Sequence, residues 1–150
     1  MIVLDTHIWV WWVDKNGRLT HKHQDWIEQY QSQGLGVSII YCWEVAKLVE
    51  LGRLTLSLAV DKRLAAALAD PGVQQLELTI PIIKSTKLTG FHRHPADQII
   101  LATVKIHECP VLTSEFLDGT RHVIYPWNQS KISNLKSSSP RIYPWGQSKI

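Results

Sequence analysis

The chain has 150 residues, 45% of them hydrophobic and 19% charged, a composition that allows one globular domain with a real core. Its net charge of +3 is weak evidence for nucleic-acid binding by the folded part, because residues 125–150 carry four basic side chains and no acidic one. The two cysteines lack CxxC spacing and no apolar run reaches about 18 residues, which argues against a disulfide framework, a zinc knuckle and a membrane span.

The first predicted element is the apolar run Ile2-Val3-Leu4, which is rich in β-branched residues and indicates a buried strand ending at Asp5. Thr6 is the expected cap of a following helix that carries the tryptophans between residues 9 and 12. No basic region precedes this apolar run, and Asp5 and His7 interrupt it, so we expect no signal peptide and a location in the reducing cytoplasm.

The later elements alternate between helical and extended patterns. Helices are predicted over residues 20–33, 41–51, 61–70, 81–88 and 95–107, and extended segments over 37–40, 76–79, 111–113 and 122–124. Gly52 is an expected helix stop, and Pro95 is favoured at a first helical position because its missing N–H costs nothing there. This alternation, without tight hairpins, predicts a three-layer α/β/α fold with a short parallel sheet of about four to five strands.

The end of the chain contains a nearly identical repeat. The segment Ile124–Ile132 returns as Ile142–Ile150, with eight of nine residues the same, and four serines lie between the two copies. Two copies are fewer than the roughly three that a solenoid needs. We therefore expect a folded domain over residues 1–125 and a basic, largely disordered extension over 126–150. An arm that binds RNA or a protein partner is the alternative.

Three acidic residues stand at informative places. Asp5 follows the first strand, Glu44 lies near the start of a predicted helix, and Asp97 lies in the first turn of another. Open parallel sheets form their active sites at the carboxyl ends of the strands. Each acid also has a structural interpretation: Asp5 and Asp97 as helix caps, and Glu44 as a surface partner of Lys47.

Other polar and aromatic clusters point less clearly to a function. The pairs His21-x-His23 and His92-x-His94 lack the further histidine or cysteine ligands that a zinc site needs. The tryptophans between residues 9 and 12 are interpreted as core or dimer contacts, with stacking on nucleic-acid bases as the alternative.

Four segments, in order, carry a resemblance to a known family. They are Leu4-Asp-Thr-His-Ile-Trp9; Trp43-Glu-Val-Ala-Lys47 with Leu51-Gly-Arg-Leu54; Phe91-His-Arg-His-Pro-Ala-Asp97 with Ile100-Leu-Ala-Thr103; and Val111-Leu-Thr-Ser-Glu115. Together they resemble the four motifs of PIN-domain proteins, in particular VapC-type toxins. The resemblance covers roughly residues 1–125, and the remaining tail has no recognisable counterpart.

The resemblance implies an endoribonuclease, a hydrolase acting on ester bonds, that uses Mg²⁺ or Mn²⁺, is blocked by a protein antitoxin and often forms a homodimer. The residues it implies as catalytic and metal-holding are Asp5, Glu44, Asp97 and Glu115. We expect Thr6, Thr113, His94 and Asp118 to support this site. Arg93 and Lys47 are candidate contacts to RNA phosphates, with solvated side chains as the alternative. Hard divalent cations prefer oxygen ligands, and a cation removes the mutual repulsion of gathered carboxylates.

Three positions depart from the family pattern. Glu115 stands where aspartate is usual, and its extra methylene moves the carboxylate by roughly 1.5 Å. Asp118, three residues further on, is the alternative fourth acid. His94 and Gln98 replace an aspartate and an arginine, so the second hypothesis is a weakened PIN domain that mainly binds antitoxin or RNA. A third is an α/β domain with an unrelated small-molecule function.

Overall fold

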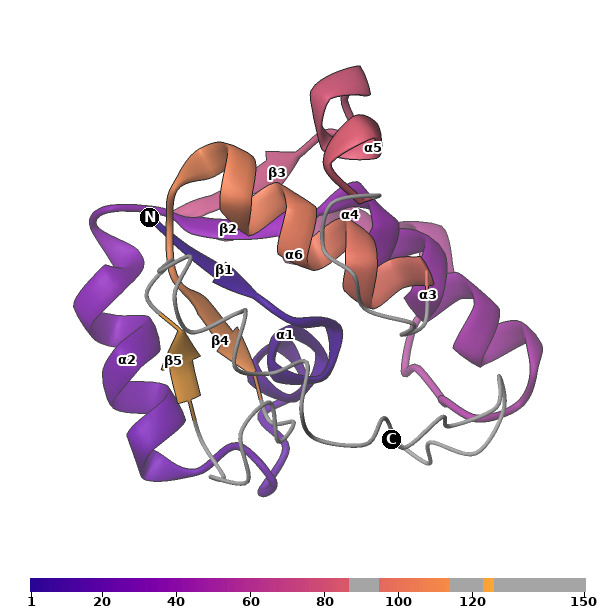
Figure 1. The fold of residues 1–150 in the computed structure, drawn as a ribbon. Coiled ribbons are helices and arrows are strands. Elements are labelled where there is room, and N and C mark those ends of the chain that lie inside the picture. Colours follow the sequence, from indigo (N-terminus) through magenta and orange to yellow (C-terminus); the bar gives the residue numbers. More distant parts are fainter. Residues whose placement is uncertain (87–94, 114–122, 126–150) are drawn as a thin grey trace, which may run out of the picture.

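The computed structural model describes residues 1–86, 95–113 and 123–125. Its elements, labelled in Figure 1, are β1 (Ile2–Leu4), α1 (Thr6–Val13), α2 (His21–Gln31), β2 (Leu35–Ser38), α3 (Ile39–Glu50), α4 (Val60–Leu68), β3 (Val73–Leu76), α5 (Ile80–Thr86), α6 (Pro95–His107), β4 (Val111–Thr113) and β5 (Val123–Tyr125). None of the helices in this part of the chain is long and apolar enough to cross a membrane. The proposed extension over residues 126–150 lies outside the described residues.

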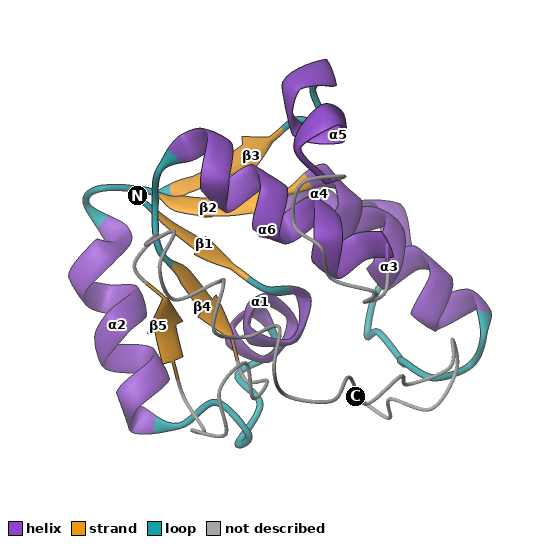
Figure 2. Cartoon of the chain, in the orientation of Figure 1, coloured by secondary structure: helices purple, strands orange, loops and turns teal. Residues whose placement is uncertain are grey.

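The strands form one sheet in the order β3-β2-β1-β4-β5, with β1 at its centre (Figure 2). The strands β3, β2, β1 and β4 are parallel, which confirms the predicted parallel sheet. The strand β5 differs, because it runs antiparallel to β4. The reason is chain length: a parallel crossover needs about a dozen residues or more, whereas only residues 114–122 join these two strands.

Helices cover both faces of the sheet, which confirms the three-layer α/β/α architecture. The chain steps from β1 to β2 and on to β3 in one direction, then returns past β1 to β4. Since crossovers between parallel strands are right-handed, α5 and α6 lie on the opposite face from α2 and α4. In Figure 1, α6 passes in front of the strands.

The core is centred on β1. All three of its residues are fully buried, as expected for the middle strand of a sheet that is covered on both faces. Trp9 from α1 is buried against this core, while Trp11 and Trp12 are half-buried and pack against it. The tryptophans that follow the first strand therefore contribute mainly to packing.

Two strands begin earlier than predicted, β2 by two residues and β3 by three. In each case the strand starts directly after a glycine with positive φ: Gly34 at 109° before β2, and Gly72 at 90° before β3. Other residues rarely adopt this conformation. Each glycine thus lets the chain turn sharply into its strand.

Candidate functional site

At the carboxyl edge of the sheet, a polar residue lies at the end of each of three neighbouring strands, β2, β1 and β4. The parallel register of β1 with β2 and β4 places Asp5 between Ser38 and Thr113, the residues at which those two strands end. Open α/β sheets bind ligands at this edge. The position of Asp5 after the central strand makes it the natural centre of a site.

Asp5 is the N-cap of α1 and is held at both carboxylate oxygens. Its Oδ1 accepts a hydrogen bond from the backbone N–H of Ile8 at 2.8 Å, and its Oδ2 accepts one from the Thr113 hydroxyl. The prediction that Thr6 caps this helix is wrong, because the backbone is still extended at Asp5 and Thr6 is already helical. Each carboxylate oxygen has two lone pairs, so these bonds are compatible with a cation ligand.

Glu44, on α3, meets the same turn of α1. The hydroxyl of Thr6 donates a hydrogen bond to Glu44 Oε2 at 2.5 Å, although 38 positions separate the two residues. Thr6 is buried and Glu44 is half-buried. Asp5 and Thr6 are adjacent at the start of α1. The first is one of the two acids, and the second donates a hydrogen bond to the other acid, Glu44.

Lys47 lies one turn further along α3, where its ammonium pairs with Glu50 at 2.6 Å. The two side chains are 41% and 64% exposed. Exposed pairs of this kind contribute about 1 kcal/mol or less. Lys47 is therefore held only weakly in this contact.

The helix α6 brings Asp97 to the same edge of the sheet. Residues 108–110 join the end of α6 to β4, and β4 is parallel to β1. The helix must therefore end at the amino edge of the sheet and begin at the carboxyl edge, where it packs against α3 (Figure 1). Asp97 is the third residue of α6, so its backbone lies on the side of the sheet where Asp5 and Glu44 lie.

The remaining expected site residues lie outside the described residues. These are Arg93, His94, Glu115 and Asp118, together with the side chain of Asp97. Among the side chains that the structure does describe, no group of three His, Cys, Asp or Glu residues could hold a metal ion. A complete metal site in this protein would therefore include ligands from these segments.

The described part of the site nevertheless fits a hard cation. It offers the carboxylates of Asp5 and Glu44, which the hydroxyls of Thr113 and Thr6 hold in place. Carboxylate oxygens are the ligands that Mg²⁺ and Mn²⁺ prefer, and Mg²⁺ typically keeps several waters besides one or two carboxylates. The chemistry of these donors thus suits either ion.

The histidine pair at 21 and 23 has a structural explanation. His23 is buried and forms a capping box with Thr20: its Nδ1 accepts from the Thr20 backbone N–H at 3.3 Å, and its own backbone N–H donates to the Thr20 hydroxyl at 3.3 Å. His21 is exposed. The Nδ1 atom of His23 therefore stabilises the start of α2. The second pair, at 92 and 94, lies outside the described residues.

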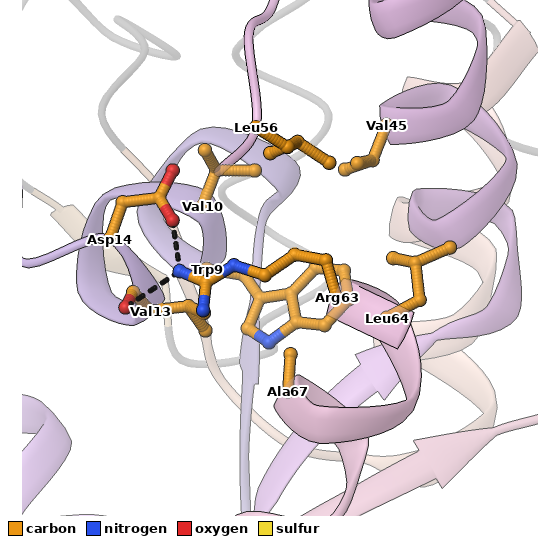
Figure 3. A pocket seen from close by; sticks show the side chains of 9 residues that line it. All are labelled: Trp9, Val10, Val13, Asp14, Val45, Leu56, Arg63, Leu64 and Ala67. Atoms are coloured by element: carbon orange, nitrogen blue, oxygen red, sulfur yellow. Dashed lines mark hydrogen bonds and ion pairs between the residues drawn. The ribbon is translucent and has the colours of Figure 1, made fainter. Parts of the chain in front are cut away.

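An apolar pocket lies elsewhere, between α1, α3 and α4 (Figure 3). It is lined by Trp9, Val10, Val13, Asp14, Val45, Leu56, Arg63, Leu64 and Ala67. Arg63 donates to the backbone carbonyl of Val13 at 3.0 Å and pairs with Asp14, so it ties α4 to the end of α1. The two charged residues that line the pocket, Asp14 and Arg63, pair with each other. None of the expected catalytic acids lines this pocket.

Both cysteines are buried free thiols, Cys42 on α3 and Cys109 before β4. Burial raises the pKa of each thiol above its ordinary value. A thiol nucleophile needs the opposite shift, towards the thiolate. Neither residue therefore has the environment of a catalytic cysteine.

Ser38 is a residue at this edge that the sequence analysis missed. It ends β2, is buried, and caps α3 by accepting a hydrogen bond from the Ile40 backbone N–H at 3.4 Å. The cap also explains why α3 begins two residues earlier than predicted. The available signal was a serine directly after an apolar run and before a helical pattern.

Comparison with known proteins agrees with this fold. The PIN domain family model matches residues 2–115. Among solved structures, the chain is similar to a chain in the crystal structure of VapBC2 from Rickettsia felis bound to a DNA fragment from their promoter. The TM-score is 0.56 at 13% sequence identity, and the match covers 77% of this chain and 89% of that one. Such low identity shows a shared fold alone. No curated protein sequence matches the chain.

Proposed function

Since the chain belongs to the PIN-domain family, we propose that it is a Mg²⁺- or Mn²⁺-dependent endoribonuclease and the VapC-like toxin of a toxin–antitoxin pair. The proposed reaction is hydrolysis of an RNA phosphodiester by an activated water. The observation that carries this proposal is that Asp5 caps the first turn of α1 at the carboxyl edge of the sheet, while the next residue, Thr6, donates a hydrogen bond to Glu44 of α3.

The cation would be held by four acids, Asp5, Glu44, Asp97 and Glu115. When bound, a divalent cation supplies Lewis acidity, which makes water more acidic and neutralises charge on the phosphodiester. The protein's contribution is to orient the carboxylates before the cation binds. Asp5 cannot turn without breaking its bonds to Ile8 and Thr113, and this fixed orientation lowers the cost of binding.

The other expected residues act around this centre. Thr6 and Thr113 support the carboxylates, and we assign a similar supporting role to His94 and Asp118. Arg93 and Lys47 are the proposed contacts to RNA phosphates. For Lys47 this requires leaving Glu50, which is cheap because the pair is exposed.

We further propose an antitoxin partner, a homodimer and a cytoplasmic location. Support for a protein interface comes from exposed apolar side chains on and next to α5 and on α6, two helices that pack together. They are Leu78, Ile80, Ile83 and Ile106. A small adjacent reading frame that encodes a DNA-binding amino-terminal half would identify the antitoxin.

The second candidate function is a catalytically weak PIN domain that mainly binds antitoxin or RNA. The sequence favours it at three positions, His94, Gln98 and Glu115, which depart from the family pattern. A misplacement of about 1 Å at a reacting group can reduce a rate on the order of 100-fold.

Cleavage of total RNA separates the two candidates. The purified protein is incubated with RNA and Mn²⁺ or Mg²⁺, beside Asp5→Asn and a matched control, Asp25→Asn. Asp25 is an exposed acid on α2, outside the site. We expect metal-dependent cleavage by the wild type and by Asp25→Asn, and none by Asp5→Asn.

Equal cleavage by the wild type and Asp5→Asn would indicate a contaminating nuclease and overturn the proposal. No cleavage by the wild type, with RNA or antitoxin binding retained, would favour the weak PIN domain.

A further inference from the structure

Trp43 is a large aromatic side chain that α3 leaves partly in solvent beside the site. It is 43% exposed, although Cys42 before it and Val45 shortly after it are buried. An indole has a flat apolar surface, and covering that surface is strongly favourable. Trp43 therefore offers a face for a ligand at the position directly before Glu44.

Lys47 lies next to both Trp43 and Glu44 on the surface of α3. It follows Trp43 by four positions and Glu44 by three, and residues at these spacings are neighbours on a helix. Its ammonium contacts Glu50 in an exposed pair that is cheap to open. An aromatic face, a cation and a carboxylate therefore lie side by side on little more than one turn of α3.

This combination suits a nucleotide better than it suits a protein partner. A base can stack on an indole while the neighbouring phosphate contacts a lysine ammonium. A protein that docked on Trp43 would also bury charged neighbours, and the buried centres of protein interfaces are depleted in charge. Ile39, one turn before Trp43, is 36% exposed, so a protein contact is the outcome against which RNA binding is tested.

We propose that Trp43 is a stacking platform for an unpaired base of the RNA, with the phosphate of that nucleotide at Lys47. This inference rests on the proposed function, since it assumes that RNA binds at this site. It also goes further, because it assigns the substrate class as single-stranded RNA. The bases of a duplex are already stacked on one another, so an indole cannot reach their faces.

Fluorescence anisotropy with a short labelled oligoadenylate measures this stacking without cleavage. Every protein, including the parent, carries Asp5→Asn, which we expect to abolish cleavage, and Mg²⁺ is present throughout. The variants are Trp43→Phe, which keeps an aromatic ring, and Trp43→Leu, which keeps only an apolar side chain. The matched control is Leu51→Ala, since Leu51 is an apolar residue at the far end of α3 that is 58% exposed.

We expect Trp43→Leu to weaken binding of the single strand roughly 5- to 150-fold, the range typical for loss of one base–aromatic stack. Trp43→Phe should lose less, and Leu51→Ala should bind like the parent. The same oligoadenylate paired with oligouridylate should bind the parent and Trp43→Leu equally. Should Trp43→Leu not fold in a thermal unfolding control, Trp43→Gln replaces it.

Equal affinity of the parent and Trp43→Leu for the single strand would overturn this inference and leave the proposed function standing. So would an equal loss in Trp43→Phe and Trp43→Leu, or an equal loss on the duplex, because neither result fits stacking. If light scattering showed that Trp43→Leu changes the oligomeric state and RNA affinity were unchanged, Trp43 would belong to a protein contact instead.

Two further outcomes separate this inference from the proposed function. A parent that binds no oligoadenylate would overturn this inference and also count against RNA as the substrate. A protein that binds the single strand through Trp43, but whose form with Asp5 intact cleaves no RNA, would overturn the proposed nuclease and leave this inference standing.

Discussion

The hydroxyl of Thr113 donates a hydrogen bond to Asp5 Oδ2, although 108 positions separate the two residues. The contact exists because β4 lies beside β1 in parallel register, so that both strands end at the same edge. The other oxygen of Asp5 caps α1. One carboxylate therefore joins the sheet to the helix that follows the central strand.

Replacing Thr113 by valine removes this donor and keeps the shape of the side chain. We expect Mn²⁺ affinity to fall about 10- to 100-fold, because Asp5 loses one of the bonds that orient it. Thr113→Ser should stay near the wild type. Calorimetric titration measures both, and an unchanged affinity in Thr113→Val would show that the cap alone orients Asp5.

The cap and the proposed metal ligand can be separated at Asp5 itself. Asparagine caps helices about as well as aspartate, whereas alanine at an N-cap costs about 0.5–2 kcal/mol. In urea unfolding with a chelator present, Asp5→Asn keeps the cap to Ile8 and loses only the oxygen that accepts from Thr113. It should therefore be more stable than Asp5→Ala, which loses both bonds. Both should lose cleavage. An equal loss of stability in the two variants would contradict a capping role.

His23 should stabilise the protein through its capping box rather than through a metal. Glutamine at this position can retain the box, so His23→Gln should keep most of the stability. Loss of the cap in a buried position should make His23→Ala less stable by about 2 kcal/mol. Thermal unfolding measures both. A chelator that destabilised the wild type but not His23→Ala would instead indicate a metal at His23.

The buried thiols predict an alkaline loss of stability. Burial raises the pKa of Cys42 and Cys109 above the ordinary 9.0, so folding favours the neutral thiols. Their contribution is fully present below about pH 9 and is lost as the pH rises through the folded-state pKa values. Urea unfolding between pH 8 and pH 11, in reducing buffer, should show this decline.

The replacement Cys42→Ala should make that decline shallower than in the wild type. Alkylation at pH 8 should also be slower in the native protein than in urea. Fast alkylation of the native protein would mean that these thiols are more accessible or more acidic than their burial indicates.

Local signals in the sequence were enough for several elements. The helix α6 was predicted from Pro95 to His107 because proline fits a first helical turn, and the structure confirms both ends. The strand β1 was equally clear, since three consecutive apolar residues suit a strand buried on both faces. The cap of α1 was expected at Thr6, with Asp5 as a second interpretation, and the structure shows Asp5, because threonine and aspartate both cap well and only the backbone distinguishes them.

By itself, the sequence determined the α/β layering and placed Asp5 at the end of the first strand, because hydrophobic periodicity and capping residues act over a few neighbouring positions. It could not determine that β5 turns back antiparallel, nor that Thr6 contacts Glu44 and Thr113 contacts Asp5. Those relationships depend on strand register and on how α1 packs against α3, which the folded chain settles by burying its apolar faces and satisfying its buried polar groups together.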